Sequence, residues 1–226
     1  MAGIEDIQVL AFDAYGTIFD VFSVTALCEE LFPGKGSALA RLWRLKQLQY
    51  SLLRSLMGRH RDFWNLTEDG LVYASKSLHL DLTSPKRKQL MDAFLHLALF
   101  PDVMPGLTAL KKKGLLLSIL SNGDPKMLGA VVENGGISGL FDTIISAKEA
   151  GIYKPSPRVY MLGPERMKVG SDQLGFVSSN SWDISGAASA GLPTFWIQRS
   201  EIEPPEELGF SAHHTVKSVS ELAQII

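Results

Sequence analysis

An aspartate stands at the end of the first apolar run of the chain, where it could serve as a nucleophile. Residues 7–12 are nearly all apolar, which predicts a strand covered on both faces of a parallel sheet. Asp13 follows directly, and the chain then breaks at Gly16 and Thr17. Open α/β sheets bind ligands at the carboxyl ends of their strands, and a carboxylate placed there can attack a substrate. The alternative is an aspartate that only caps a turn.

Polar groups also follow three later segments. They are Ser121 and Asn122, then Lys154, then Ser178, Ser179, Asn180 and Asp183. Because parallel strands bring their carboxyl ends to one edge of the sheet, we expect these groups to converge with Asp13 in a single crevice. Each segment alone also fits a turn, a surface loop or the start of a helix. Their occurrence together, in this order, favours a site.

Strands and helices alternate from residue 105 onward. We expect strands at 115–120, 141–146, 174–177, 193–197 and near 215–216, and helices at 105–113, from 125, from 157, at 183–190 and from 218. This alternation predicts an α/β fold with a Rossmann-like, doubly wound, mostly parallel sheet. Gly163 and Pro164 should shorten or kink the helix that follows Lys154.

Residues 21–100 lack this alternation and predict a helical insert instead. The helices indicated there by the spacing of apolar residues are 37–57, 61–78 and 85–99. Ser84 is the expected N-cap of the last one. We therefore expect a core domain of residues 1–20 and 101–226. The helical cap domain of residues 21–100 would sit above the carboxyl edge of its sheet.

Composition limits the classes of function. The chain has 226 residues, 46% of them hydrophobic, which suffices for a sizeable core. A net charge of −2 gives no field that would recruit nucleic acid or an anionic membrane. We expect no signal peptide and no membrane span, because the first residues lack a basic start and no apolar run reaches roughly 20 residues. The single cysteine, Cys28, excludes an internal disulfide and fits a cytoplasmic location.

Four motifs make the sequence resemble the haloacid dehalogenase superfamily of hydrolases. They are FDAYGT around Asp13, LSNG around Ser121, YKP around Lys154, and SSNSWD ending at Asp183. The resemblance covers nearly the whole chain, including the position of the helical insert. More narrowly, the chain is similar to the L-2-haloacid dehalogenase (type II) branch. The segments that carry this closer likeness are FDAYGT, LWRLKQLQY, RSLM and FVSSNSWD.

The resemblance implies a two-step displacement that uses no metal and no cofactor. Asp13 would attack the carbon that bears the halogen, giving an ester and free halide, and water would then hydrolyse the ester at the Asp13 carbonyl. Lys154 would hold Asp13 ionised and oriented, and Thr17 and Asn180 would hydrogen-bond the nucleophile. The implied substrates are short (S)-2-haloacids, and the products are (R)-2-hydroxyacids and halide.

The resemblance also assigns residues to the second step. Asp183 would activate water or orient the lysine, acting with Ser178 and Asn180. Tyr160, six places after Lys154, would position that lysine. Because members of the family are commonly dimers, a homodimer is expected as well.

Substrate-binding positions carry over in the same way. Ser121 and nearby backbone N–H groups would bind the substrate carboxylate. The halide-binding positions match Arg44 and Asn122, the hydrophobic wall matches Phe63 and Trp182, and Tyr15, Leu48 and Phe63 would line the pocket. Arg44 lies on a helix rich in Arg and Lys, so a solvated helix face is the alternative for this residue.

Two departures from the superfamily pattern bear on the reaction. Most relatives are magnesium-dependent phosphatases with a general-acid Asp where this chain has Tyr15, and usually a further Asp where it has Ser179. Tyrosine, with a pKa near 10, is a poor proton donor at neutral pH, and magnesium prefers carboxylate ligands. A halide leaving group needs neither proton nor magnesium. The alternatives are a magnesium-dependent phosphatase with an unusual metal site, and a non-catalytic domain of this fold that binds a small carboxylate.

Overall fold

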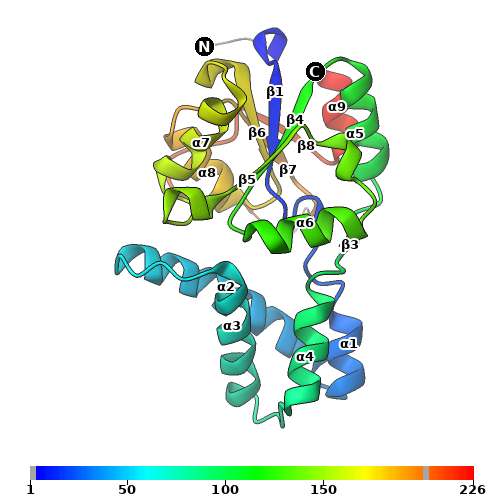
Figure 1. Ribbon diagram of the computed structural model, residues 1–226. Coiled ribbons are helices and arrows are strands. Elements are labelled where there is room, and N and C mark those ends of the chain that lie inside the picture. Colours follow the sequence, from blue (N-terminus) through cyan, green and yellow to red (C-terminus); the bar gives the residue numbers. More distant parts are fainter. Residues whose placement is uncertain (1–3, 201–203) are drawn as a thin grey trace.

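A six-stranded parallel sheet organises the larger part of the molecule. The computed structural model describes residues 4–200 and 204–226, and the sheet order within them is β5-β4-β1-β6-β7-β8 (Figure 1). The strands are β1 (Val9–Phe12), β4 (Leu116–Ser121), β5 (Thr143–Ser146), β6 (Leu174–Ser178), β7 (Thr194–Ile197) and β8 (His214–Val216). All four residues of β1 are fully buried, as a strand covered on both faces requires. The predicted doubly wound α/β fold is confirmed.

Helices cover both faces of this sheet. They are α5 (Val103–Lys112), α6 (Pro125–Asn134), α7 (Pro157–Met167), α8 (Ser181–Ser189) and α9 (Val219–Ile225). Short 3₁₀ turns lie at η1 (Ile4–Asp6), η2 (Ser138–Leu140), η3 (Ala147–Ala150) and η4 (Ser171–Gln173). In Figure 1, α5 and α9 lie on one side of the sheet and α7 and α8 on the other. Strand β1 pairs with β4 and β6, so Asp13 leaves the middle of the sheet.

Four helices form a separate layer beyond the carboxyl end of the sheet (Figure 1). They are α1 (Thr25–Leu31), α2 (Gly36–Leu56), α3 (Phe63–Ser77) and α4 (Ser84–Ala93). The chain enters this cap through β2 (Phe19–Asp20) and returns through β3 (Ala98–Leu99), and the two strands pair antiparallel. The domain boundaries at residues 20 and 100 stay a prediction. None of the described helices is long and apolar enough to cross a membrane.

Two helix predictions were wrong in detail. The helix expected at 85–99 ends at Ala93, because Ala98 and Leu99 pair with the strand that enters the cap. Thr83, not Ser84, stands at the N-cap position of this helix. The helix after Lys154 is not shortened by its proline, since α7 continues through the buried Pro164 to Met167. The kink expected at this proline stays a prediction.

Candidate active site

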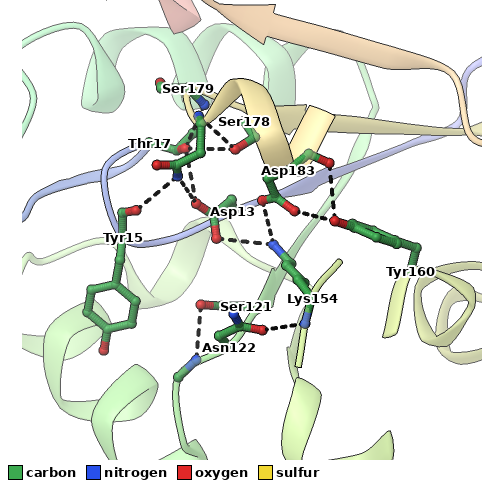
Figure 2. Close-up of polar contacts among 12 residues, drawn as sticks. Asp13, Tyr15, Thr17, Ser121, Asn122, Lys154, Tyr160, Ser178, Ser179 and Asp183 are labelled. Carbon is green, nitrogen blue, oxygen red and sulfur yellow. Dashed lines mark hydrogen bonds and ion pairs between the residues drawn. The ribbon is translucent and has the colours of Figure 1, made fainter. Parts of the chain in front are cut away.

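A buried lysine joins two carboxylates at the carboxyl edge of the sheet. Lys154 Nζ lies 3.1 Å from Asp13 Oδ1 and 2.9 Å from Asp183 Oδ2 (Figure 2). Asp13 directly follows β1, Lys154 stands in the loop between η3 and α7, and Asp183 lies in the first turn of α8. All three side chains are buried, so each charge depends on the others for compensation. The convergence expected from the strand ends is therefore present.

Tyr160 contacts Asp183 and not the lysine. Its hydroxyl donates to Asp183 Oδ1 over 2.7 Å, whereas Lys154 donates to the other oxygen of the same carboxylate (Figure 2). The expectation that Tyr160 positions Lys154 stays a prediction, and the route that the contacts offer for it is through Asp183. Burial raises the pKa of Tyr160 well above its usual value, which keeps the hydroxyl a donor.

The pKa of Asp183 is raised to about 6. Burial is the main cause, the charge of Asp13 adds to it, and the charge and hydrogen bond of Lys154 together with the Tyr160 hydrogen bond oppose it. A carboxyl group with a pKa near neutrality is suited to accept and release protons during a reaction.

The second oxygen of Asp13 is held by two neutral groups. Asn180 Nδ2 donates to Asp13 Oδ2 over 2.8 Å, and the Thr17 hydroxyl donates to the same oxygen over 3.3 Å. Thr17 in turn accepts from the backbone N–H of Ser179 at 2.8 Å. Asp13 is thus fixed from both sides, by an ammonium at one oxygen and an amide and a hydroxyl at the other.

The remaining polar residues of the motifs support these loops. Ser178 Oγ accepts from the backbone N–H of Asn180 at 3.1 Å, and Ser121 Oγ accepts from that of Gly123 at 3.2 Å. Asn122 Oδ1 accepts from the backbone N–H of Lys154 at 2.9 Å. The amide oxygen of Asn122 holds the loop that carries Lys154. The amide nitrogen of Asn122 is therefore the end of the side chain that could bind an anion.

Arg44 reaches from the cap to the core. Its guanidinium donates to the carbonyl oxygen of Tyr15 over 3.0 Å and to Gln47 Oε1 over 2.7 Å, and the side chain is partly buried. Burial lowers the pKa of Arg44, and the charge of Asp13 is the largest opposing influence. The alternative of a solvated face does not hold for this residue, because the guanidinium points into the joint between cap and core.

A cavity of about 310 Å³ lies beside Arg44. Its lining includes Gly16, Arg44, Leu48, Asn180, Trp196 and Arg199. Two of the residues expected at the pocket, Arg44 and Leu48, therefore face the same space as Asn180. Trp182 is partly buried in the first turn of α8, and the tryptophan that lines the cavity is Trp196.

Aromatic side chains close the other side of the motif loop. The ring of Tyr15 lies 6.1 Å from that of Phe63 and 5.8 Å from that of Phe94, between ring centroids. The hydroxyl of Tyr15 is buried without a hydrogen-bond partner among the described residues. Burial raises the pKa of Tyr15 far above its usual value, so the phenol is an even poorer acid than expected.

Sequence reasoning missed several neighbours of the site. Gln47 holds Arg44 and could have been found, because it lies three residues further along the same helix face. Arg199, which donates to the Thr17 carbonyl oxygen over 2.6 Å and pairs with Asp102 over 2.7 Å, follows the end of β7. No motif marks Arg199, and only the sheet topology brings it near Thr17.

The residues of the site do not fit a magnesium ion. Within the described ranges, no group of three or more His, Cys, Asp or Glu side chains could hold a metal ion. The two carboxylates that meet here, Asp13 and Asp183, both bind the ammonium of Lys154. Position 179 supplies a serine hydroxyl, which is a weaker magnesium ligand than the carboxylate of the phosphatases.

Comparisons with known proteins define the class. A model of the haloacid dehalogenase-like hydrolases matches residues 7–191. The chain belongs to this family of hydrolases, as the motifs indicated.

Relatives that match nearly the whole chain carry narrower names. The (S)-2-haloacid dehalogenase of Pseudomonas sp. (strain YL) is 43% identical over 219 residues, 97% of this chain and 94% of that protein. Haloacetate dehalogenase H-2 of Moraxella sp. (strain B) is 40% identical over 220 residues, 97% of this chain and 98% of that protein. The structure of L-2-haloacid dehalogenase from Xanthobacter autotrophicus with chloropropionic acid covalently bound superposes with a TM-score of 0.90. It is 34% identical, and the match covers 97% of this chain and 98% of the other.

Proposed function

We propose that this protein is an (S)-2-haloacid dehalogenase, which hydrolyses short (S)-2-haloacids to (R)-2-hydroxyacids and halide. The observation that carries the proposal is the position of Lys154 Nζ between Asp13 and Asp183. One carboxylate is thereby oriented as a nucleophile, and the other, with its raised pKa, is available as a base. The likeness to relatives named for this reaction supports it.

In the first step, an oxygen of Asp13 attacks the carbon that bears the halogen. A carbon–oxygen bond forms as the carbon–halogen bond breaks, and the halogen leaves with the bonding electron pair. The product of this step is an ester of Asp13 with the substrate carbon inverted. Lys154 at one oxygen and Asn180 at the other restrict the carboxylate to one orientation, which favours an in-line attack.

In the second step, water hydrolyses this ester. Asp183 takes a proton from water, the hydroxide attacks the ester carbonyl carbon of Asp13, and the bond from that carbon to the product oxygen breaks. The product alkoxide takes up that proton from Asp183. Asp13 is regenerated as a carboxyl group that contains one oxygen from water, and it returns to a carboxylate by losing the remaining water proton to solvent. Lys154 and Asn180 would stabilise the negative charge that develops on the carbonyl oxygen. Thr17 and Ser178 would hold the loops that carry these groups.

We expect other residues of this site to recognise the substrate. Ser121 and neighbouring backbone N–H groups would bind the substrate carboxylate. Arg44 and the amide nitrogen of Asn122 would accept the leaving halide. Tyr15, Leu48, Phe63 and Trp182 would form the apolar surroundings that exclude water from the ester.

Halide release from each enantiomer of 2-chloropropionate, measured in EDTA, tests the proposal. Wild type should release chloride from the (S) enantiomer alone, and Asp13→Asn should release none. If neither enantiomer loses chloride, the dehalogenase proposal fails for short haloacids. Magnesium-stimulated release of phosphate from phosphate esters would then favour a phosphatase, and binding of a small carboxylate without turnover would favour a non-catalytic domain.

We also propose that the active form is a homodimer in the cytoplasm. Several large apolar side chains of the cap are exposed on neighbouring turns of α2 and α3: Leu45, Leu52, Leu53, Leu56, Met57 and Tyr73. Of these, Leu53, Met57 and Tyr73 line one groove between α2 and α3. Exposed apolar side chains gathered in this way are typical of an interface, and a second copy of the chain would cover them. The single cysteine is buried and unpaired, which suits a reducing compartment.

A further inference from the structure

The connection between α2 and α3 docks on the loops of the core that carry the site. The backbone N–H of Trp64 donates to Asp124 Oδ2 over 2.8 Å, and Asp62 Oδ1 lies 2.9 Å from Lys148 Nζ. Asp62 and Asp124 stand at the N-cap positions of α3 and α6, yet neither side chain caps its own helix. Both carboxylates instead join cap to core, and the first turn of α3 is held by a residue of the core.

Tyr153 lies at the centre of this joint. It belongs to the core, but its hydroxyl donates to the carbonyl oxygen of Arg61, and its backbone N–H donates to Ser55 Oγ over 3.1 Å. Its ring centroid lies 4.9 Å from that of His60 and 5.7 Å from that of Phe63. All four of these partners are cap residues. The side chain is 1% exposed, so the docked cap encloses it almost completely.

The residue after Tyr153 is the lysine that joins the two carboxylates. The backbone N–H of Lys154 is held by Asn122, and its ammonium lies 3.1 Å from Asp13 and 2.9 Å from Asp183. Displacing this backbone by a fraction of an ångström would lengthen one of these two ion pairs. The cap therefore fixes the backbone N–H of residue 153, and the core fixes that of residue 154.

We infer that Tyr153 is a positioning residue, which places the ammonium of Lys154 between Asp13 and Asp183 when the cap is docked. The inference rests on the proposed function for the reaction steps it affects. A cap that lifts from the core removes the partners of the Tyr153 hydroxyl and N–H groups together. Closure over a substrate then completes the site, and an open cap leaves Lys154 free to move away from the nucleophile.

Tyr153→Phe tests this with the loss of one oxygen atom. The lost hydrogen bond to the cap should lower kcat about tenfold, with a smaller change in KM. The charge of Lys154 lowers the pKa of Asp183, so displacing the lysine should raise that pKa. The acid limb of the pH–rate profile should therefore move to higher pH. The charged or titratable groups facing Asp183 are Lys154, Asp13, Tyr160 and, at longer range, Arg44. Ser55→Ala removes the partner that the cap offers to the backbone N–H of Tyr153. This variant should change kcat and the acid limb in the same direction as Tyr153→Phe.

Tyr50→Phe is the matched control. Tyr50 also belongs to the cap, but its ring lies against that of Tyr73, with 6.2 Å between the ring centroids, and the substitution keeps the ring. This variant should have wild-type kcat and pH profile. A Tyr153→Phe enzyme with a lower melting temperature but unchanged kcat and acid limb would overturn the inference, because the ring would then serve only packing. A change in KM alone would overturn it too.

A second readout does not depend on turnover. Lys154 is 2% exposed, so an amine-acylating reagent followed by mass spectrometry should label it very slowly in wild type. Tyr153→Phe should increase this labelling several-fold, with Lys111 on α5 unchanged as the internal reference. If wild type released no halide, the proposed function would fail and the labelling would still decide the inference. Equal labelling of Lys154 in the two proteins would count against it.

Discussion

The hydroxyl of Tyr160 donates to one oxygen of Asp183, and the ammonium of Lys154 donates to the other. Both oxygens of this buried carboxylate are thus bound by groups that favour its charged form, against the strong effect of burial. The pKa of Asp183 is the balance of these influences, and it can be changed by removing either donor.

Tyr160→Phe should shift the acid limb of kcat to higher pH. The hydrogen bond from Tyr160 lowers the pKa of Asp183, so its loss raises that pKa above about 6 and leaves less carboxylate at neutral pH. At pH 7 we expect kcat to fall about twofold to fifteenfold, because a hydrogen bond to a charged group contributes about 1.5–3 kcal/mol, which corresponds to a rise of roughly one to two in the pKa of Asp183. The pH–rate profile of halide release checks this. An unchanged acid limb would show that Asp183 does not act as a base.

Asp183→Asn should change the pH dependence of stability. The folded-state pKa of Asp183 is raised from 3.8 to about 6, so its contribution to stability is present below 3.8 and is lost as the pH rises through 6. The variant has no titrating carboxyl group at position 183, so its stability does not fall in this way as the pH rises. The free energy of unfolding of the variant, minus that of wild type, should therefore increase by about 2 kcal/mol between pH 4 and pH 7. Urea denaturation at several pH values measures it, and a difference that stays constant with pH would contradict the assignment.

Gly186→Ala should displace Tyr160. A Cβ at this position would overlap the Tyr160 hydroxyl oxygen and lie 2.7 Å from Pro155 Cβ. We expect a loss of about 1–3 kcal/mol in the free energy of unfolding and a decrease in kcat, measured by denaturation and halide release.

Gly129→Ala is the matched control for this substitution. Gly129 lies inside α6, and a Cβ there would meet nothing within 4 Å. Replacing a helical glycine by alanine should then stabilise the protein by about 0.5–1 kcal/mol, with kcat unchanged. If the two substitutions had the same effect, a general response to glycine replacement would explain both.

Leu56→Glu should separate the proposed dimer. The side chain of Leu56 is 77% exposed on α2, so a charge there should cost the monomer little and should oppose burial against a second copy. Light scattering after gel filtration should report a dimer for wild type and a monomer for the variant. Ile225→Glu replaces an exposed apolar residue on α9 and should remain a dimer. A wild-type monomer would refute the proposed interface.

The sheet and the convergence of the motifs were predictable because their signals are local. Apolar runs gave the strands, and parallel strands fix where a residue such as Asp13 or Asp183 must lie. The parts that were missed depend on packing between distant segments. The partner of Tyr160 is set by how α7 lies against α8, and the helix expected at 85–99 ends early because of a strand about 80 residues before it.

The joint between cap and core could not be inferred from motif matching. Tyr153 sits inside the YKP motif, yet nothing local to the sequence shows that its partners are Ser55 and Arg61. Asp124 looks like an ordinary N-cap of α6, and only the tertiary structure shows that it binds Trp64 instead. Residues that join the cap to the core do not contribute to the periodic pattern of apolar residues in the sequence of either part.

The central position of β1 has a consequence for how the chain is made. Val9 pairs with Leu116 and Leu174, about 110 and about 165 residues later, so β1 leaves the ribosome well before both of the strands that it pairs with. Until then a fully apolar strand is exposed, with unpaired edges that favour aggregation. Such distant pairings slow refolding. The chain must lose the entropy of closing long loops before it forms the contacts that compensate for this loss. Asp13, the proposed nucleophile, is therefore synthesised well before the strands that flank it in the folded sheet.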